Sequence, residues 1–317
     1  MADVIKCATR DAYGAALKQL GSRDDILVLD ADLAKATKTI TFKKEFPEKF
    51  IDCGIAEGNM MGVAAGLATT GYTVFASSFA MFAAGRAFEQ VRNSIAYPNL
   101  NVKIGATHAG ISVGEDGASH QCCEDIALMR SIPNMVIINP ADDVEAMAAV
   151  HAAVDHEGPV YMRFGRLAVP RINSEDYKFE LGKGVLLKDG KDVTIVATGL
   201  MVNEAIIAAE ALAAEGIDAR VINIHTIKPI DKDILVAAAK ETGAIVTAEE
   251  HSVIGGLGSA VSEALAEEYP VPVVKLGVND TFGKSGPALE LLKIFGLDAE
   301  NIVIKAKKAI ELKNKLA

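Results

Sequence analysis

Tryptophan is absent from this 317-residue sequence, aromatic residues make up only 5% of it, and cysteine occurs four times. The cysteines stand at positions 7, 53, 122 and 123. These positions match no metal-binding spacing, and the adjacent pair argues against a disulfide framework. The first ten residues also lack the apolar run of a secretory signal. We therefore expect a protein of a reducing compartment, the cytoplasm.

The sequence also lacks a cluster of basic residues. It has 42 acidic residues against 32 lysines and arginines, a formal net charge of −10, so we expect no nucleic-acid partner. An anionic ligand would have to be bound by a few local arginines. No membrane association is expected either. A long uncharged run, residues 58–85, contains five glycines and several hydroxyl side chains, which is typical of a buried protein interior.

Length and an apolar content of 50% predict two domains, since single hydrophobic cores rarely grow past about 250 residues. A continuous apolar run at 26–29, and further β-prone runs such as 193–197, alternate with segments of helical periodicity. Such runs predict parallel strands that are buried on both faces. We expect an α/β fold of two three-layer α/β/α domains with mostly parallel sheets. The domains would comprise residues 1–172 and 187–317, with a linker at 173–186.

Residues 104–121 form the stretch with the strongest signal for chemistry, because His108, Asp116, His120 and four glycines fall within it. A β-prone run ends at residue 107, so the loop is expected at the carboxyl end of a strand, where open α/β sheets bind ligands. Glycines let the backbone approach a ligand closely, and imidazole can transfer protons. A structural role for either histidine remains open. Their separation matches no metal-binding signature, and no metal ligand is predicted in this chain.

Two acids stand at junctions between a predicted strand and a helix. Asp32 follows the strand at 26–29, where it would reach a ligand or cap the next helix. Glu57 lies beside the uncharged run 58–85. A carboxyl group in apolar surroundings can hold a proton near neutral pH, which makes Glu57 a candidate proton donor. The alternative is an acid that favours the first turn of a helix.

Aromatic and basic residues supply the other candidates. Phe75, Phe79 and Phe82 fall within eight residues, either as core residues or as a stacking surface. Arg163 and Arg166 follow a predicted strand and would clamp a phosphate, or remain solvated.

Several of these motifs resemble those of the thiamine diphosphate enzymes, in particular the C-terminal half of transketolase. The similar segments, in order, are Gly54-Ile-Ala-Glu57-Gly, Ser78-Phe79-Ala-Met-Phe82, Thr107-His108 and Gly114-Glu-Asp116-Gly-Ala-Ser-His120-Gln121. A further similarity, Glu249-Glu-His251-Ser-Val-Ile-Gly-Gly-Leu-Gly258, lies in the second predicted domain. The resemblance covers almost the whole chain. It implies a pyrimidine-binding domain followed by a transketolase C-terminal domain.

The resemblance also implies a role for each candidate residue. Glu57 would bind the ring nitrogen of the cofactor's aminopyrimidine and promote formation of the thiazolium carbanion. Phe79 and Phe82, with Phe75, would hold the pyrimidine ring. The residues expected to bind substrate hydroxyls, move protons or face the reacting carbons are His108, His120, Asp116 and Asp32. The residues expected to bind the sugar phosphate are Arg10, Arg166 and Arg163.

Several features depart from the family pattern. Ala109 follows His108 where the family usually has aspartate, Gly85 replaces an aromatic residue, and Ala36 stands where a phosphate-binding serine is common. The module that binds the diphosphate and its metal, a Gly-Asp-Gly followed at a distance by Asn, is missing. Because a magnesium diphosphate is strongly anionic and must be bound, we expect an N-terminal transketolase subunit as partner, in an α2β2 heterotetramer.

The leading hypothesis is the C-terminal, β-type subunit of a split transketolase, acting on sugar phosphates in the non-oxidative pentose phosphate pathway. The first alternative is another half of a thiamine enzyme. It would be the E1 β subunit of a 2-oxo acid dehydrogenase or a protein like deoxyxylulose-phosphate synthase. The second alternative is a non-catalytic binding or regulatory module.

Overall fold

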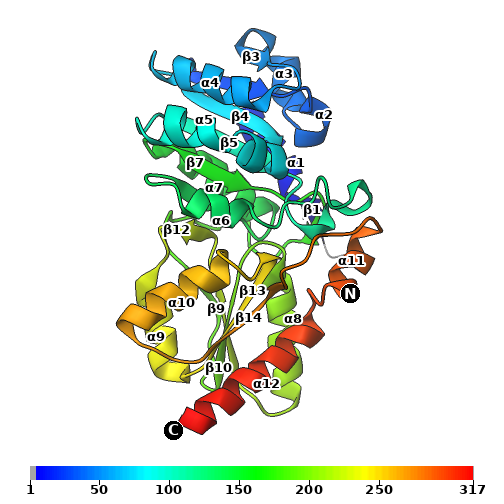
Figure 1. Ribbon diagram of the computed structural model, residues 1–317, viewed down its shortest axis with the longest axis vertical. Helices are drawn as coiled ribbons and strands as arrows, with labels where there is room; N and C mark the ends of the chain where they lie inside the picture. The colour runs from blue at the N-terminus through cyan, green and yellow to red at the C-terminus, as the bar shows by residue number, and fades with distance from the viewer. Residues whose placement is uncertain (1–4, 317) are drawn as a thin grey trace.

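The computed structural model describes residues 5–316, so the outermost parts of the two predicted domains, residues 1–4 and 317, lie outside the described residues. Two α/β/α domains follow one another along the chain, the first drawn in blue to green and the second in yellow-green to red (Figure 1). Between them, residues 171–184 form neither helix nor strand. The expected fold class, two three-layer domains with mostly parallel sheets, is confirmed.

The first domain is built on a seven-stranded sheet of order β12-β6-β7-β5-β4-β2-β3, in which every strand except β12 runs parallel to its neighbours. Its own strands are β2 (Ile26–Asp30), β3 (Phe50–Asp52), β4 (Thr73–Phe79), β5 (Val102–Thr107), β6 (Val136–Ile138) and β7 (Val160–Arg163). Most are buried along their length, as expected for parallel strands covered on both faces.

Helices cover both faces of this sheet. One face packs against α1 (Thr9–Leu20) and α7 (Asp143–Asp155). The other packs against α4 (Glu57–Ala68), η2 (Met81–Arg86), α5 (Phe88–Gln90), η3 (Val91–Ala96) and α6 (Asp125–Arg130). Smaller elements complete the domain: α2 (Ala34–Thr37), α3 (Ile40–Glu45), η1 (Pro47–Lys49), η4 (Ile111–Asp116) and a ribbon of β1 (Lys6–Ala8) with β8 (Ala168–Pro170).

The second domain has a five-stranded sheet of order β14-β13-β10-β11-β9 in which only the edge strand β9 is antiparallel. The strands are β9 (Val185–Lys188), β10 (Val193–Ala197), β11 (Ala219–Asn223), β13 (Ile245–Ser252) and β14 (Val273–Val278). The helices are α8 (Met201–Ala214), α9 (Lys232–Thr242), α10 (Leu257–Glu268), α11 (Ala288–Ile294) and α12 (Ala299–Leu316). None of the helices between residues 5 and 316 is long and apolar enough to cross a bilayer.

The two domains are joined by shared structure. Strand β12 (Thr226–Lys228) leaves the second domain and pairs antiparallel with β6 of the first. A buried ion pair lies close by, because Arg163 Nε donates to Asp125 Oδ2 at 2.8 Å and Arg163 Nη2 donates to the carbonyl of Glu250 at 2.9 Å. One hydrophobic core continues from the first sheet to α9 and α10. These contacts fix the second domain beneath the first (Figure 1).

Candidate active site

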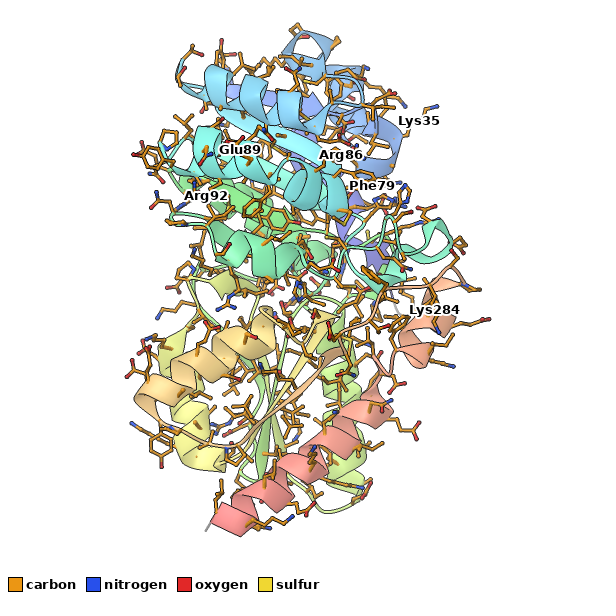
Figure 2. The ribbon with its side chains drawn as sticks, viewed as in Figure 1. Lys35, Phe79, Arg86, Glu89, Arg92 and Lys284 are labelled. Carbon is orange, nitrogen blue, oxygen red and sulfur yellow. The ribbon has the colours of Figure 1, made fainter. Side chains whose placement is uncertain are left out.

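Four predicted site residues stand at the ends of neighbouring strands. Asp32 follows β2, Phe79 ends β4, His108 follows β5 and Arg166 follows β7. Strands β7, β5, β4 and β2 are adjacent and parallel, so their carboxyl ends meet at one edge of the sheet. Figure 2 shows Phe79 and Arg86 close together on the right-hand side of the first domain, with Lys35 above them and Lys284 of the second domain below.

An aromatic cluster forms the centre of this edge. The rings of Phe79 and Phe82 are nearly parallel, with centroids 6.0 Å apart and an interplanar angle of 14°. The His108 ring stacks on Phe79 at 3.8 Å, and the His120 ring meets Phe82 edge-on at 5.4 Å. Phe79 is buried, whereas Phe82 and His120 are only half-buried. The cluster therefore offers a partly open aromatic surface with two imidazoles beside it.

Glu57 lies beneath this surface, at the start of α4, with only 2% of its side chain exposed. The expected isolation of its carboxyl group is wrong, because Arg86 Nη1 donates to Glu57 Oε2 at 2.9 Å. The Arg86 guanidinium also lies over the Phe82 ring, 4.6 Å from the centroid. The acid is thus buried next to the aromatic pair, as the sequence indicates, but it carries a cationic partner.

His108 is held as a neutral imidazole. Arg10 Nη1 donates to His108 Nε2 at 2.8 Å, and because a guanidinium only donates, this nitrogen must be the acceptor. The proton is therefore on Nδ1, which lies 2.9 Å from the hydroxyl oxygen of Thr107. Burial, together with the positive charges of Arg10 and Arg166, lowers the pKa of His108 to about 3. The backbone of His108 has a φ of 57°, a strained conformation for this residue.

Two of the predicted phosphate-binding arginines reach the same loop. Arg166 Nη1 donates to the carbonyl of Val113 and to Glu115 Oε2, and it lies 3.8 Å from Asp116 Oδ2. Arg10 also donates to the carbonyl of Ala36 at 3.2 Å. Its Nε is buried and has no hydrogen-bond partner among residues 5–316, so a donor remains for an anionic ligand.

Three predicted site residues have surroundings that differ from those expected for their roles. Arg163 does not bind phosphate in this arrangement, because it is 3% exposed and paired with Asp125 at the domain interface. Phe75 is fully buried against Tyr13 on the α1 side of the sheet, so it cannot touch a pyrimidine ring at the edge. Asp32 is exposed, with a φ of 62°, and only its backbone N–H is engaged, donating to Asp52 Oδ1 at 3.2 Å.

Two residues that the sequence reasoning missed contribute to the site. Arg86 is the first, since a pair that spans 29 positions leaves no local pattern in the sequence. Asp30 is the second: it is buried, accepts from the hydroxyls of Thr37 at 2.7 Å and Thr39 at 2.9 Å, and orders the segment that follows β2. Burial raises its pKa to about 6 although these hydrogen bonds oppose the rise. The motif Asp30-Ala-Asp32 contains both acids, but the sequence analysis predicts a site role only for Asp32.

The site fits one half of thiamine diphosphate. A buried carboxyl group and two stacked phenylalanine rings, of which Phe82 is half-buried, suit an aminopyrimidine. Nothing comparable is present for the other half, because within the described part of the chain no three His, Cys, Asp or Glu side chains form a group that could hold a metal ion.

Comparison with known proteins identifies the family. The sequence matches "Transketolase, pyrimidine binding domain" over residues 5–171 and "Transketolase, C-terminal domain" over residues 182–302. The chain belongs to the transketolase family. The resemblance of its motifs to those of transketolase is thereby confirmed.

Similar proteins match the transketolase chain along almost its whole length. A protein of Methanocaldococcus jannaschii, provisionally named a transketolase C-terminal section, is 53% identical over 95% of both chains. A 6-deoxy-6-sulfo-D-fructose transketolase subunit from a Clostridium species is 47% identical over 96% of this chain and 95% of its own. A solved structure described as "Split gene transketolase, inactive beta4 tetramer" is 60% identical, covers 96% of this chain and 99% of its own, and superposes with a TM-score of 0.91.

Proposed function

We propose that this chain is the C-terminal subunit of a two-component transketolase. It would transfer a two-carbon ketol unit between ketose and aldose phosphates in the non-oxidative pentose phosphate pathway, with thiamine diphosphate as cofactor. The observation that carries the proposal is the position of buried Glu57 at the carboxyl ends of the strands, where its partner Arg86 lies over the ring of Phe82, which stacks with Phe79.

When bound, thiamine diphosphate would supply the carbanion nucleophile that ketol transfer needs. Glu57 would hold or donate a proton at the ring nitrogen of the aminopyrimidine, while Phe79 and Phe82 fix the plane of that ring. His108, as a neutral imidazole, would bind a substrate hydroxyl. His120 would exchange a proton with the sugar, and its ring position against Phe82 supports this role. Asp116 would bind substrate hydroxyls and help to move protons, and Asp32 would face the reacting carbons.

Arg10 and Arg166 are proposed to bind the phosphate of the sugar. Support comes from the unpartnered Nε of Arg10 and from the position of Arg166 beside Asp116. The relative named for 6-deoxy-6-sulfo-D-fructose shows that family members accept another anionic group at the end of the sugar chain. Ala36, Gly85 and Ala109 depart from the family pattern and are the positions at which sugar preference would be set.

A second polypeptide is proposed to complete the site. It would supply the Gly-Asp-Gly module, the divalent cation and the diphosphate contacts that this sequence lacks. The similar split-gene protein is described as inactive in its β4 form, which supports the dependence on a partner. We propose an α2β2 assembly in the cytoplasm, with the cofactor across the interface between the two kinds of subunit.

The test is reconstitution. The purified chain is mixed with its N-terminal partner subunit, magnesium and thiamine diphosphate, and transfer from xylulose 5-phosphate to ribose 5-phosphate is followed. Transfer that requires both subunits supports the proposal. Turnover of a 2-oxo acid instead would favour the dehydrogenase E1 β alternative. The regulatory alternative would be favoured if no cofactor-dependent reaction occurs and Glu57→Ala retains the binding or regulatory function of the wild type.

A further inference from the structure

Arg86 makes two contacts that together have the geometry of a ligand. Its guanidinium carbon lies 4.6 Å from the centroid of the Phe82 ring, and its Nη1 donates to Glu57 Oε2 at 2.9 Å. A guanidinium is planar, delocalised and a hydrogen-bond donor, so it can stack on an aromatic face and bind a carboxylate at the same time. These are the two interactions that Phe82 and Glu57 are proposed to make with the cofactor's aminopyrimidine.

The backbone beneath Arg86 is fixed, but the side chain is not. Arg86 is the last residue of the π-helix η2, and its neighbours Ala83, Ala84 and Ala87 are fully buried. The Arg86 side chain, by contrast, is 53% exposed, and its polar partner among the described residues is Glu57. An arginine side chain can therefore turn toward solvent without moving the helix.

Both contacts of Arg86 are weak enough to break easily. An ion pair with one exposed partner and a cation–π contact at the surface each contribute little, because solvent screens them. Glu57 itself is buried and needs a hydrogen-bond partner at all times, since an unpaired buried carboxylate is costly. The arrangement suits exchange, in which Arg86 satisfies Glu57 until another planar donor replaces it.

We propose that Arg86 occupies the pyrimidine position of the cofactor-free subunit and must turn out before the cofactor binds. This inference rests on the proposed function and deepens it: Arg86 is a competing internal ligand that lowers the apparent affinity for thiamine diphosphate. Only molecules in which Arg86 has turned out can bind the cofactor. The apparent dissociation constant is therefore the intrinsic one divided by the fraction of such molecules. Removal of the competing side chain therefore tightens cofactor binding, whereas removal of a cofactor contact would weaken it.

The matched variants are Arg86→Ala and Arg92→Ala. Arg92 is exposed in the next helical segment and its Nη1 donates to neighbouring Asn93 rather than to a site residue. Figure 2 shows Arg86 beside Phe79, with Glu89 and Arg92 toward the other end of this helical stretch. The dissociation constant of thiamine diphosphate, with magnesium, is measured by calorimetry on the complex reconstituted with the N-terminal subunit. Arg86→Ala is expected to bind about five- to twentyfold more tightly than the wild type, and Arg92→Ala as the wild type.

A second variant guards against failure of the first to fold. Arg86→Gln keeps an amide donor beside Glu57 but has no charge and no planar fork, and it is expected to tighten binding by a smaller factor. Unchanged or weaker binding in folded Arg86→Gln and Arg86→Ala overturns the inference. If the wild-type complex itself binds no thiamine diphosphate, the proposed function fails and this inference falls with it. Tight wild-type binding with no gain in either variant overturns the Arg86 inference alone.

Discussion

The imidazole of His108 lies flat against the ring of Phe79, with centroids 3.8 Å apart and an interplanar angle of 24°. This contact joins the two parts of the proposed site, because Phe79 ends β4 on the cofactor side and His108 follows β5 on the substrate side. Arg10 holds the far edge of the imidazole. The stack thus stabilises a histidine whose backbone is strained.

Two arginines three positions apart are expected to behave in opposite ways when they are replaced. Arg163→Met leaves buried Asp125 without its cationic partner, so the free energy of unfolding should fall by about 3–5 kcal/mol. Urea unfolding measures this loss. An unchanged unfolding midpoint in Arg163→Met would contradict the assignment of Arg163 to the domain interface.

Arg166→Ala removes a half-exposed side chain at the sugar-binding edge and should leave the unfolding free energy nearly unchanged. In the reconstituted enzyme we expect the KM for the phosphorylated substrate to rise about tenfold or more, since a charge-assisted hydrogen bond is lost. Steady-state kinetics with a phosphorylated and an unphosphorylated ketose provide the measurement. An equal loss with both substrates would argue against phosphate binding by Arg166.

The ionisation of His108 predicts acid sensitivity. Burial, Arg10 and Arg166 lower its pKa to about 3, whereas the unfolded chain takes up a proton near the ordinary value of 6.5. Between these values the unfolded state binds more protons, so stability decreases as the pH falls through this window, by at most about 1.4 kcal/mol per pH unit. His108→Gln should remove this share of the dependence. Titration by NMR should show no His108 ionisation between pH 5 and 8, and a titration near 6.5 would refute the buried neutral imidazole.

The ionisation of Glu250, at the domain interface, predicts the opposite dependence of stability on pH. Burial raises its pKa from 4.5 to about 7, against the opposing effects of Arg163 and of the Ser112 N–H, which donates to it at 2.5 Å. The folded state therefore binds more protons between these values. Its contribution to stability is complete below pH 4.5 and is lost as the pH rises through 7.

Glu250→Gln should flatten this slope, which reaches at most about 1.4 kcal/mol per pH unit. The difference in unfolding free energy between variant and wild type, measured from pH 4.5 to 8, gives the contribution directly. Glu210→Gln, on the exposed side of α8, is the control. A wild-type slope that persists in Glu250→Gln would show that Glu250 does not bind the proton.

The layers of the fold could be predicted from the sequence because buried parallel strands appear as mainly apolar runs, as at β2 and β10. Strand β12 could not be, since three residues carry no periodicity and its partner β6 belongs to the other domain. The π-helical turns of η2 and η3 were also missed, because their wider turns depend on packing rather than on local propensity.

The part of the candidate site that lies directly at the carboxyl ends of strands could be predicted from the sequence. Phe79 and His108 stand at strand ends, and both lie in the cluster. Phe75 lies on the same face of β4 as Phe79, four positions earlier, but it is in the middle of the strand, where α1 covers it. The prediction that Arg163 binds phosphate fails for a similar reason. A basic residue at a strand end is expected to face solvent, but here the second domain covers it. Long-range partners of this kind cannot be read from one sequence.

The central claim is that Glu57 of this chain activates a cofactor whose other half is held by a partner subunit. The most direct measurement is the rate at which the C2 proton of bound thiamine diphosphate exchanges with deuterium in the reconstituted complex, followed by NMR. In Glu57→Gln the cofactor should still bind, but exchange should slow by about 100-fold or more, whereas exposed Glu89→Gln should match the wild type. Exchange at the wild-type rate in Glu57→Gln would contradict the account.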